Sequence, residues 1–152
     1  MNSNNKTIAG IDPGKKGAVA VISKDHSIIV KSITWIDNDI DLDPLADILC
    51  GVDLVALEKV SAFPLMGKVA CFAFGDGYGQ LRAVLRAWHI SYVLVPPKRW
   101  RAAILDGLPK GKEASVLYCQ RKYPHLNIRK TQDGLADAIC IAEYAVKQEN
   151  GK

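Results

Sequence analysis

The sequence has no apolar run that approaches the roughly 18 to 20 residues needed to cross a bilayer, and its first ten residues lack the basic and then apolar pattern of a secretory signal. It has only three histidines, and its four cysteines lie far apart, in apolar surroundings and without a CxxC pair. These absences argue against a zinc site and favour four buried free thiols in a reducing compartment. We therefore expect a cytoplasmic protein that does not contact a membrane.

The composition is that of a chain that folds around a core. Of its 152 residues, 49% are hydrophobic and 24% are charged, and the mean hydropathy is +0.03. This balance excludes a disordered or collagen-like chain. The length suits one domain spanning residues 1–152 and is too short for two full-sized lobes.

Charge is distributed unevenly along the chain, although the net charge is only +4. Residues 1–75 hold 7 Lys and Arg against 9 Asp and Glu, a net −2, whereas residues 76–152 hold 13 against 7, a net +6. Such asymmetry is typical of a protein whose basic half binds a polyanion, and it also occurs on surfaces that are simply solvated.

Apolar patterning predicts an α/β domain. Three antiparallel strands are expected first, over residues 7–12, 18–22 and 27–35, followed by an acidic loop over 37–43 and a short helix that Asp43 caps and Cys50 ends. Two further buried strands are expected over 54–58 and 90–95, with a glycine-containing loop over 63–79 and a helix over 80–88 between them. Three helices follow, over 98–105, 112–123 and 132–147, so the fold is a mixed sheet flanked by helices.

Four acidic residues occupy positions where solvated acids are uncommon. Asp12 and Glu58 each end an apolar strand, while Asp133 and Asp137 are four residues apart on one face of the last predicted helix. That helix is apolar on nearly every side around Asp137, and an ionised carboxylate buried there costs several kcal/mol without a compensating charge. A bound cation would supply that charge.

Taken singly, three of these acids have structural explanations. Asp12 precedes a Pro-Gly turn and suits a turn aspartate, Asp133 suits a helix cap, and Glu58 suits a salt bridge with a lysine. Asp137 is the hardest to explain in this way, and four unrelated placements together are less economical than one shared site. Carboxylate ligands favour Mg²⁺ or Mn²⁺, and two such ions about 4 Å apart can activate a water and stabilise the leaving oxygen of a phosphodiester. With the basic second half, this pattern indicates a metal-dependent nuclease.

Several motifs along the chain resemble those of a known family. They are GIDPG at residues 10–14 with GAVAV at 17–21, LEKV at 57–60, FGDGYGQL at 74–81, VPPKRW at 95–100 and DGLADA at 133–138. In this order and spacing they resemble the RuvC-type Holliday-junction resolvases of the RNase H-like superfamily, with the phage-type and chloroplast-type branches most similar. Asp133 and Asp137 are four apart, as in the chloroplast-like branch, whereas many bacterial members space these acids by three.

The resemblance implies an RNase H-like nuclease domain that acts as a homodimer, binds a four-way DNA junction and nicks two opposing strands symmetrically. It implies two Mg²⁺ or Mn²⁺ ions per active site, no organic cofactor, and a bacterial or phage-infected host cell. Carried over by position, the metal-binding catalytic acids are Asp12, Glu58, Asp133 and Asp137. Lys112 matches a basic residue near the scissile phosphate, Lys98 matches another lysine, and Phe63 lies where the family places residues that unstack bases at the crossover.

Other basic residues are expected to hold the DNA arms through phosphate contacts, which position the protein without reading sequence: Arg99, Arg101, Lys110, Arg121, Lys122, Arg129 and Lys130. Lys98, Lys112 and Phe63 also suit solvated or core-anchoring roles. The glycines at 75, 77 and 79 favour close approach to DNA or to a partner subunit, and alternatively shape a turn into the next helix.

Three rival functions remain for such a chain. A related nuclease would act on other branched DNA, such as a flap, and a monomeric state would favour it. A non-catalytic junction-binding scaffold would be expected to have lost at least one of the four acids. An actin-like phosphotransferase also opens with Asp-x-Gly before a hairpin, but that fold needs two lobes.

Overall fold

The computed structural model describes residues 6–151 of the chain. Its strands are β1 (Ile8–Asp12), β2 (Ala18–Ile22), β3 (Ile28–Ser32), β4 (Trp35–Ile36), β5 (Asp39–Ile40), β6 (Leu54–Glu58) and β7 (Tyr92–Val95). Its helices are α1 (Leu42–Leu49), α2 (Lys68–Ala87), α3 (Pro97–Ile104), α4 (Ala114–Lys122) and α5 (Asp133–Asn150), with a 3-10 turn η1 (Pro124–Leu126).

Five of the strands form one mixed sheet in the order β3-β2-β1-β6-β7. The first three strands are antiparallel, and β6 and β7 run parallel to β1, which confirms the predicted sheet. In the register between β1 and β6, Ile11 pairs with Leu57. Asp12 and Glu58 therefore end neighbouring parallel strands at the same edge of the sheet.

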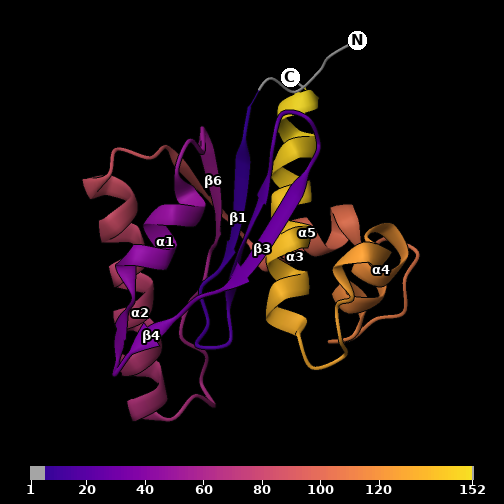
Figure 1. The fold of residues 1–152 in the computed structure, drawn as a ribbon. Coiled ribbons are helices and arrows are strands. Elements are labelled where there is room, and N and C mark those ends of the chain that lie inside the picture. The colour runs from indigo at the N-terminus through magenta and orange to yellow at the C-terminus, as the bar shows by residue number, and fades with distance from the viewer. Residues whose placement is uncertain (1–5, 152) are drawn as a thin grey trace.

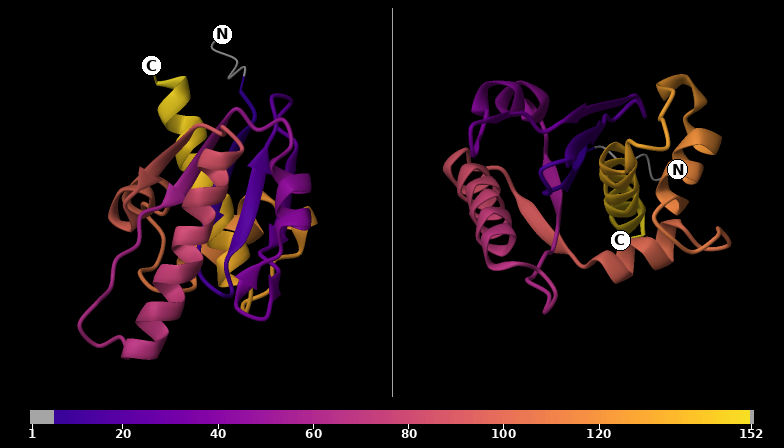
Figure 2. Two further views of the ribbon diagram at one scale, coloured as in Figure 1. Left: turned by 90° about the vertical axis from the view of Figure 1, so that its left-hand side faces the viewer. Right: turned by 90° about the horizontal axis from the view of Figure 1, so that it is seen from below.

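Helices cover both faces of this sheet (Figure 1). Helices α1 and α2 lie on one side, α5 packs along the other, and α3 and α4 lie beyond α5 (Figure 2). Two apolar cores result, because side chains alternate between the faces of a strand. Residues such as Ile8 and Ile139 fill the core on the α5 side, and Ile11 and Leu85 fill the core on the α1–α2 side.

Two glycines let α5 lie directly on the backbone of the first hairpin. A Cβ atom placed at Gly10 in β1 would overlap the backbone of Ala138 and Ala142. A Cβ atom at Gly134 would overlap the carbonyl of Lys16 in the turn between β1 and β2. Because no side chain separates these backbones, the first turn of α5 is held against the end of β1 that carries a predicted catalytic acid.

The prediction of a loop over residues 63–79 is wrong for most of this range, because helix α2 occupies it from Lys68 onward. Only residues up to Gly67 lie outside the helix, which begins at Lys68 and runs through all three glycines of FGDGYG. Glycine costs about 1 kcal/mol relative to alanine inside a helix, and tertiary packing outweighs that cost here. Leu81 and Leu85 are fully buried under the sheet, and a Cβ at Gly77 would collide with the Trp35 ring. The close approach at Gly77 is therefore to a side chain of the same chain.

Two other boundaries differ from those predicted. Strand β3 stops at Ser32, and residues expected to continue it or to form an acidic loop make the small β4–β5 hairpin instead. Gln80 of α2 connects this hairpin to the helix, because its side-chain Oε1 accepts a hydrogen bond from the Ile40 N–H at 2.8 Å. Helix α1 is capped by Asp41 rather than Asp43, and it ends before Cys50.

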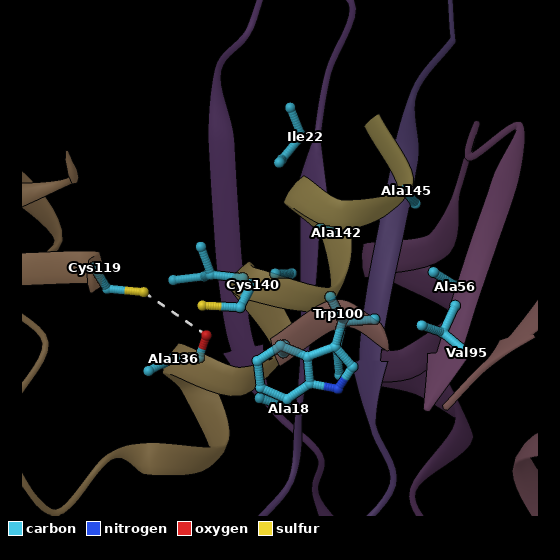
Figure 3. Packing of buried hydrophobic residues seen from close by; sticks show 14 of the residues in the cluster. Ala18, Ile22, Ala56, Val95, Trp100, Cys119, Ala136, Cys140, Ala142 and Ala145 are labelled. Carbon is cyan, nitrogen blue, oxygen red and sulfur yellow. Dashed lines mark hydrogen bonds between the residues drawn. The ribbon is translucent and has the colours of Figure 1, made fainter. Parts of the chain in front are cut away.

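The prediction of four buried thiols was half right. Cys119 and Cys140 are fully buried between α4 and α5, where Cys119 Sγ donates to the Ala136 carbonyl at 3.7 Å (Figure 3). Cys50 is exposed because it follows the end of α1, and Cys71 is only partly covered on the outward-facing start of α2. All four are free thiols. Within the described chain, no helix is long and apolar enough to cross a membrane.

Candidate active site

The four predicted acids come together at the edge of the sheet where β1 and β6 end. Ile11 and Leu57 point into the α1–α2 core, so the next residues, Asp12 and Glu58, point to the α5 side. Asp133 is the first residue of α5, and Asp137 follows one turn later on the same face of that helix. Three separate elements thus bring these carboxylates to one place.

The electrostatics of Asp12 indicate that the other three acids are near enough to interact with it. Burial raises the pKa of Asp12 from 3.8 to about 7, and repulsion from Glu58, Asp137 and Asp133 adds to that rise. The Gly14 N–H opposes it, because it donates a hydrogen bond to Asp12 Oδ1 at 3.3 Å. At neutral pH, Asp12 is therefore poised between its neutral and charged forms until a cation compensates the charge.

The other two inward acids are perturbed in the same direction. Burial raises the pKa of Glu58, with a further contribution from the charge on Asp137. Burial also raises the pKa of Asp137, and the negative charge of Asp133 raises it further. The Ser115 hydroxyl and the positive charge of Arg101 lower it. Raised carboxyl pKa values from burial and mutual repulsion mark a site with excess negative charge, as in metal-binding and catalytic centres.

Helix α3 supplies direct partners for two of the acids from consecutive residues. Trp100 Nε1 donates to Glu58 Oε1 at 2.8 Å, and Arg101 Nη2 donates to Asp137 Oδ2 at 3.2 Å. The Trp100 indole is fully buried in the core between the sheet and α5 (Figure 3). Sequence reasoning assigned Trp100 no role and placed Arg101 only on DNA phosphates. The sequence signal for a role of Trp100 is that this aromatic residue lies inside the basic run KRWR, residues 98–101.

Asp137 has one oxygen that fits a cation. Its Oδ1 is buried without a hydrogen bond of normal geometry within residues 6–151, although the Ser115 hydroxyl, fully buried at the start of α4, lies near enough to lower the pKa of Asp137. A buried carboxylate oxygen left unpaired is costly, and hard divalent cations prefer such oxygens. As the side chains stand, however, no three Asp, Glu, His or Cys residues in the described chain form a metal-ligating group. The shared metal site therefore stays a prediction.

The predicted DNA-binding basic residues fall into two groups. Lys98 and Arg99 are exposed at the start of α3. Lys110 and Lys112 lie in the loop before α4 and, with Lys130, line one hollow. Lys112 lines this hollow and is exposed, and its predicted place near the acids stays a prediction. Lys122 is engaged by Glu143 at 2.7 Å.

Phe63 lies in the loop between β6 and α2, five residues after Glu58. Its side chain is 58% exposed, and Leu65 in the same loop is 96% exposed. Phe63 therefore does not anchor the loop in the core, which was the alternative role for it. Figure 2 shows this loop and the start of α2 extending past the end of the sheet where β6 finishes.

Replacing Asp12 by asparagine should stabilise the protein at high pH in metal-free buffer. At pH 4 the folded carboxyl is neutral and the unfolded one, with its pKa near 3.8, is about half ionised, so the variant and the wild type should differ in stability by less than about 1 kcal/mol. Above about pH 7 only the wild type must bury a charge, so Asp12→Asn should gain about 1–3 kcal/mol. Urea unfolding in EDTA at pH 4 and pH 8 measures this, with exposed Asp47→Asn as the control. Equal stabilities at pH 8 would contradict the raised pKa.

The strand order, with three antiparallel strands followed by two parallel ones and helices on both faces, is the RNase H-like fold that the motifs predicted. No protein-family model matches the chain, and no curated protein matches it in sequence. Solved structures do match, and junction resolvases are among them.

Three of these structures cover nearly all of this chain. RuvC of T. thermophilus in complex with a Holliday junction is 15% identical, with a TM-score of 0.60 over 93% of this chain and 94% of that chain. The fowlpox virus resolvase in complex with Holliday junction DNA is 16% identical, with a TM-score of 0.59 over 93% and 99%. The yeast mitochondrial resolvase Ydc2 is 16% identical, with a TM-score of 0.51 over 95% and 79%. The resemblance to RuvC-type resolvases is thereby confirmed at the level of the fold.

Proposed function

We propose that this chain is a single-domain, structure-selective endodeoxyribonuclease that resolves four-way DNA junctions by symmetric, metal-dependent hydrolysis. The observation that carries the proposal is the gathering of Asp12, Glu58, Asp133 and Asp137 at one sheet edge, with the pKa values of three of them raised. The fold supports it, because structural neighbours of this chain were determined with Holliday junction DNA.

The residues at this edge have separate tasks. Asp12, Glu58, Asp133 and Asp137 would hold Mg²⁺ or Mn²⁺ once their side chains turn toward a common point. A divalent cation bound there supplies activation of water and neutralisation of charge on the phosphodiester. The Gly14 N–H bonds one oxygen of Asp12 and the Trp100 N–H bonds one oxygen of Glu58, so each carboxylate is oriented through that oxygen while the rest of the group can turn toward a cation.

The surrounding basic residues would position the DNA. Lys112, in the loop before α4, would neutralise charge that develops on the scissile phosphate. Phosphate contacts along the arms would come from the exposed residues Lys98, Arg99, Lys110, Arg121, Arg129 and Lys130. Phe63 would insert at the crossover, where its exposed ring stacks on an unpaired base.

The test is a cleavage assay on a panel of labelled DNAs with Mg²⁺ or with EDTA. The panel contains four-way junctions with fixed and mobile crossovers, a three-way junction, a flap and a linear duplex. We expect nicks at symmetry-related positions on two opposing strands of the four-way junction. We expect no cutting in EDTA. Preferential cutting of the flap would favour the nuclease for other branched DNA, and binding without cutting would favour a scaffold.

Symmetric cutting requires two active sites related by a two-fold axis, and α2 offers a surface for a second copy. Val69 and Phe72 are 85% and 79% exposed, and they lie on one stripe of the helix with Gly79. The Cβ position of Gly79 has no atom within 4 Å, so another helix could approach closely there. Such an exposed apolar stripe is typical of an interface, and we propose that α2 pairs with α2 of a second copy.

Replacing Phe72 by aspartate should convert the dimer into a monomer, because two charges would face each other across the apolar stripe. Light scattering after gel filtration measures the mass. Ile29→Asp is the matched control, since Ile29 is 54% exposed on β3, away from α2. The monomer should nick junctions on one strand at a time. A Phe72→Asp protein that remains dimeric would rule out this interface.

A further inference from the structure

Arg101 is fixed beside the acidic site by its neighbour along the chain. Its guanidinium carbon lies 4.5 Å from the centre of the Trp100 ring, and Trp100 is fully buried and bonded to Glu58. Stacking on an immobile indole holds the guanidinium over Asp137, with which it forms the 3.2 Å ion pair. The indole thus gives the guanidinium a defined position beside Asp137, while the partly exposed Arg101 side chain can still move.

The two partners are unequally exposed. The Asp137 side chain is 19% exposed and points inward, whereas the Arg101 side chain is 38% exposed. Arg101 and Lys110 line a hollow at the end of α3 together with one acid, Asp106, and the hollow adjoins the lysines of the loop before α4. The guanidinium therefore faces the acids on one side and, on the other, a basic surface open to an anion. It carries five N–H groups, and one is used on Asp137.

We propose that Arg101 acts as an internal counter-cation that competes with the divalent ion for Asp137 and moves to a DNA phosphate when the junction binds. The inference rests on the proposed function. Two cations at one carboxylate repel each other, so the ion pair lowers the metal affinity of the free protein. A phosphate diester accepts two parallel N–H bonds from a guanidinium, so DNA would draw Arg101 away and leave Asp137 free. Metal loading and junction binding then favour each other, as linkage requires.

The first measurement is Mn²⁺ affinity of the free protein by calorimetry. Arg101→Gln removes the competing charge and should bind Mn²⁺ about tenfold more tightly than the wild type. Arg86→Gln, in the last turn of α2 on the opposite face of the sheet, loses the same charge at a residue that bonds Tyr92 and should change the affinity less than twofold. Arg101→Lys keeps the charge but has no planar group to stack on Trp100, so its Mn²⁺ affinity should lie between those of the wild type and Arg101→Gln. It replaces Arg101→Gln in the comparison if the glutamine variant does not fold.

The second measurement is a double-mutant cycle on junction affinity in EDTA, where no cutting takes place. Asp137→Asn frees Arg101 and should tighten binding about fivefold. In an Arg101→Gln background the same change should tighten binding less than twofold, because only the general loss of negative charge remains. Equal effects in the two backgrounds would show that Arg101 does not move to DNA.

The outcomes separate this inference from the proposed function. If the wild type binds Mn²⁺ and Arg101→Gln binds it equally or more weakly, Arg101 has only a structural role and the competition is overturned. If neither protein binds Mn²⁺, the metal-dependent nuclease is overturned together with the competition.

Discussion

Junction cutting is expected to fall about 10³-fold or more when Asp137 is replaced by asparagine. Asp137 stands in an apolar helix, with one oxygen bonded to Arg101, the other oxygen buried, and the Ser115 hydroxyl near the carboxylate. An asparagine has nearly the same shape but no charge, so it removes a ligand of the proposed ions without leaving a cavity. A loss of this size is typical when a group that stabilises the charge of the transition state is removed.

The measurement is single-turnover cleavage of a four-way junction, with junction binding followed separately by gel shift. Binding should be retained or strengthened, because a negative charge beside the DNA is lost. Asp12→Asn should reduce cutting to the same extent, although Asp12 lies on β1 and Asp137 lies on α5. Asp47→Asn is the control, because this exposed acid lies on α1, on the opposite face of the sheet from α5. Cutting by either active-site variant at near the wild-type rate would remove the basis of the metal-dependent mechanism.

The arrangement of the acids could be predicted because it depends on local periodicity. β1 and β6 are both continuous apolar runs that end in an acid, and because the two strands are parallel both runs end at the same edge. The four-residue spacing of Asp133 and Asp137 fixes their shared helix face without knowledge of the fold. Strand ends and helix faces are properties of short segments, so the sequence is sufficient to infer them.

The partners of the acids depend on packing between distant segments, which no local pattern specifies. Trp100 reaches Glu58 across 42 positions of sequence, and Arg101 reaches Asp137 across 36. Helix α2 is a similar case: its glycines predict a loop by propensity, but Gly77 packs under Trp35 from the β4–β5 hairpin. In both cases a tertiary contact decides the structure.

Gly10 combines a local sequence pattern with a contact between distant segments. In sequence it is one letter of GIDPG and is typical of a turn-flanking strand residue. In the structure it is the place where β1 touches the α5 backbone, so the distance between Asp12 and Asp137 depends on the absence of a side chain there. The acids are thus positioned by backbone contact between β1 and α5 as well as by the elements that carry them.

Replacing Trp100 by alanine is expected to cost about 3–5 kcal/mol of unfolding free energy, because its fully buried indole fills the core between the sheet and α5. Trp100→Phe keeps most of that packing but has no N–H for Glu58, so the carboxylate loses its fixed orientation. The phenylalanine variant should therefore lose much less stability and still cut junctions about tenfold more slowly.

Urea unfolding and single-turnover cleavage of the same protein samples separate these two effects of Trp100. Trp88 gives the matched control, since it caps α2 on the far side of the sheet and is 36% exposed. Trp88→Ala should lose less than half the stability lost by Trp100→Ala, and Trp88→Phe should cut at the wild-type rate. If Trp100→Phe also cuts at the wild-type rate, then the hydrogen bond to Glu58 does not position that acid for catalysis, and Trp100 contributes to the site only through the core it fills.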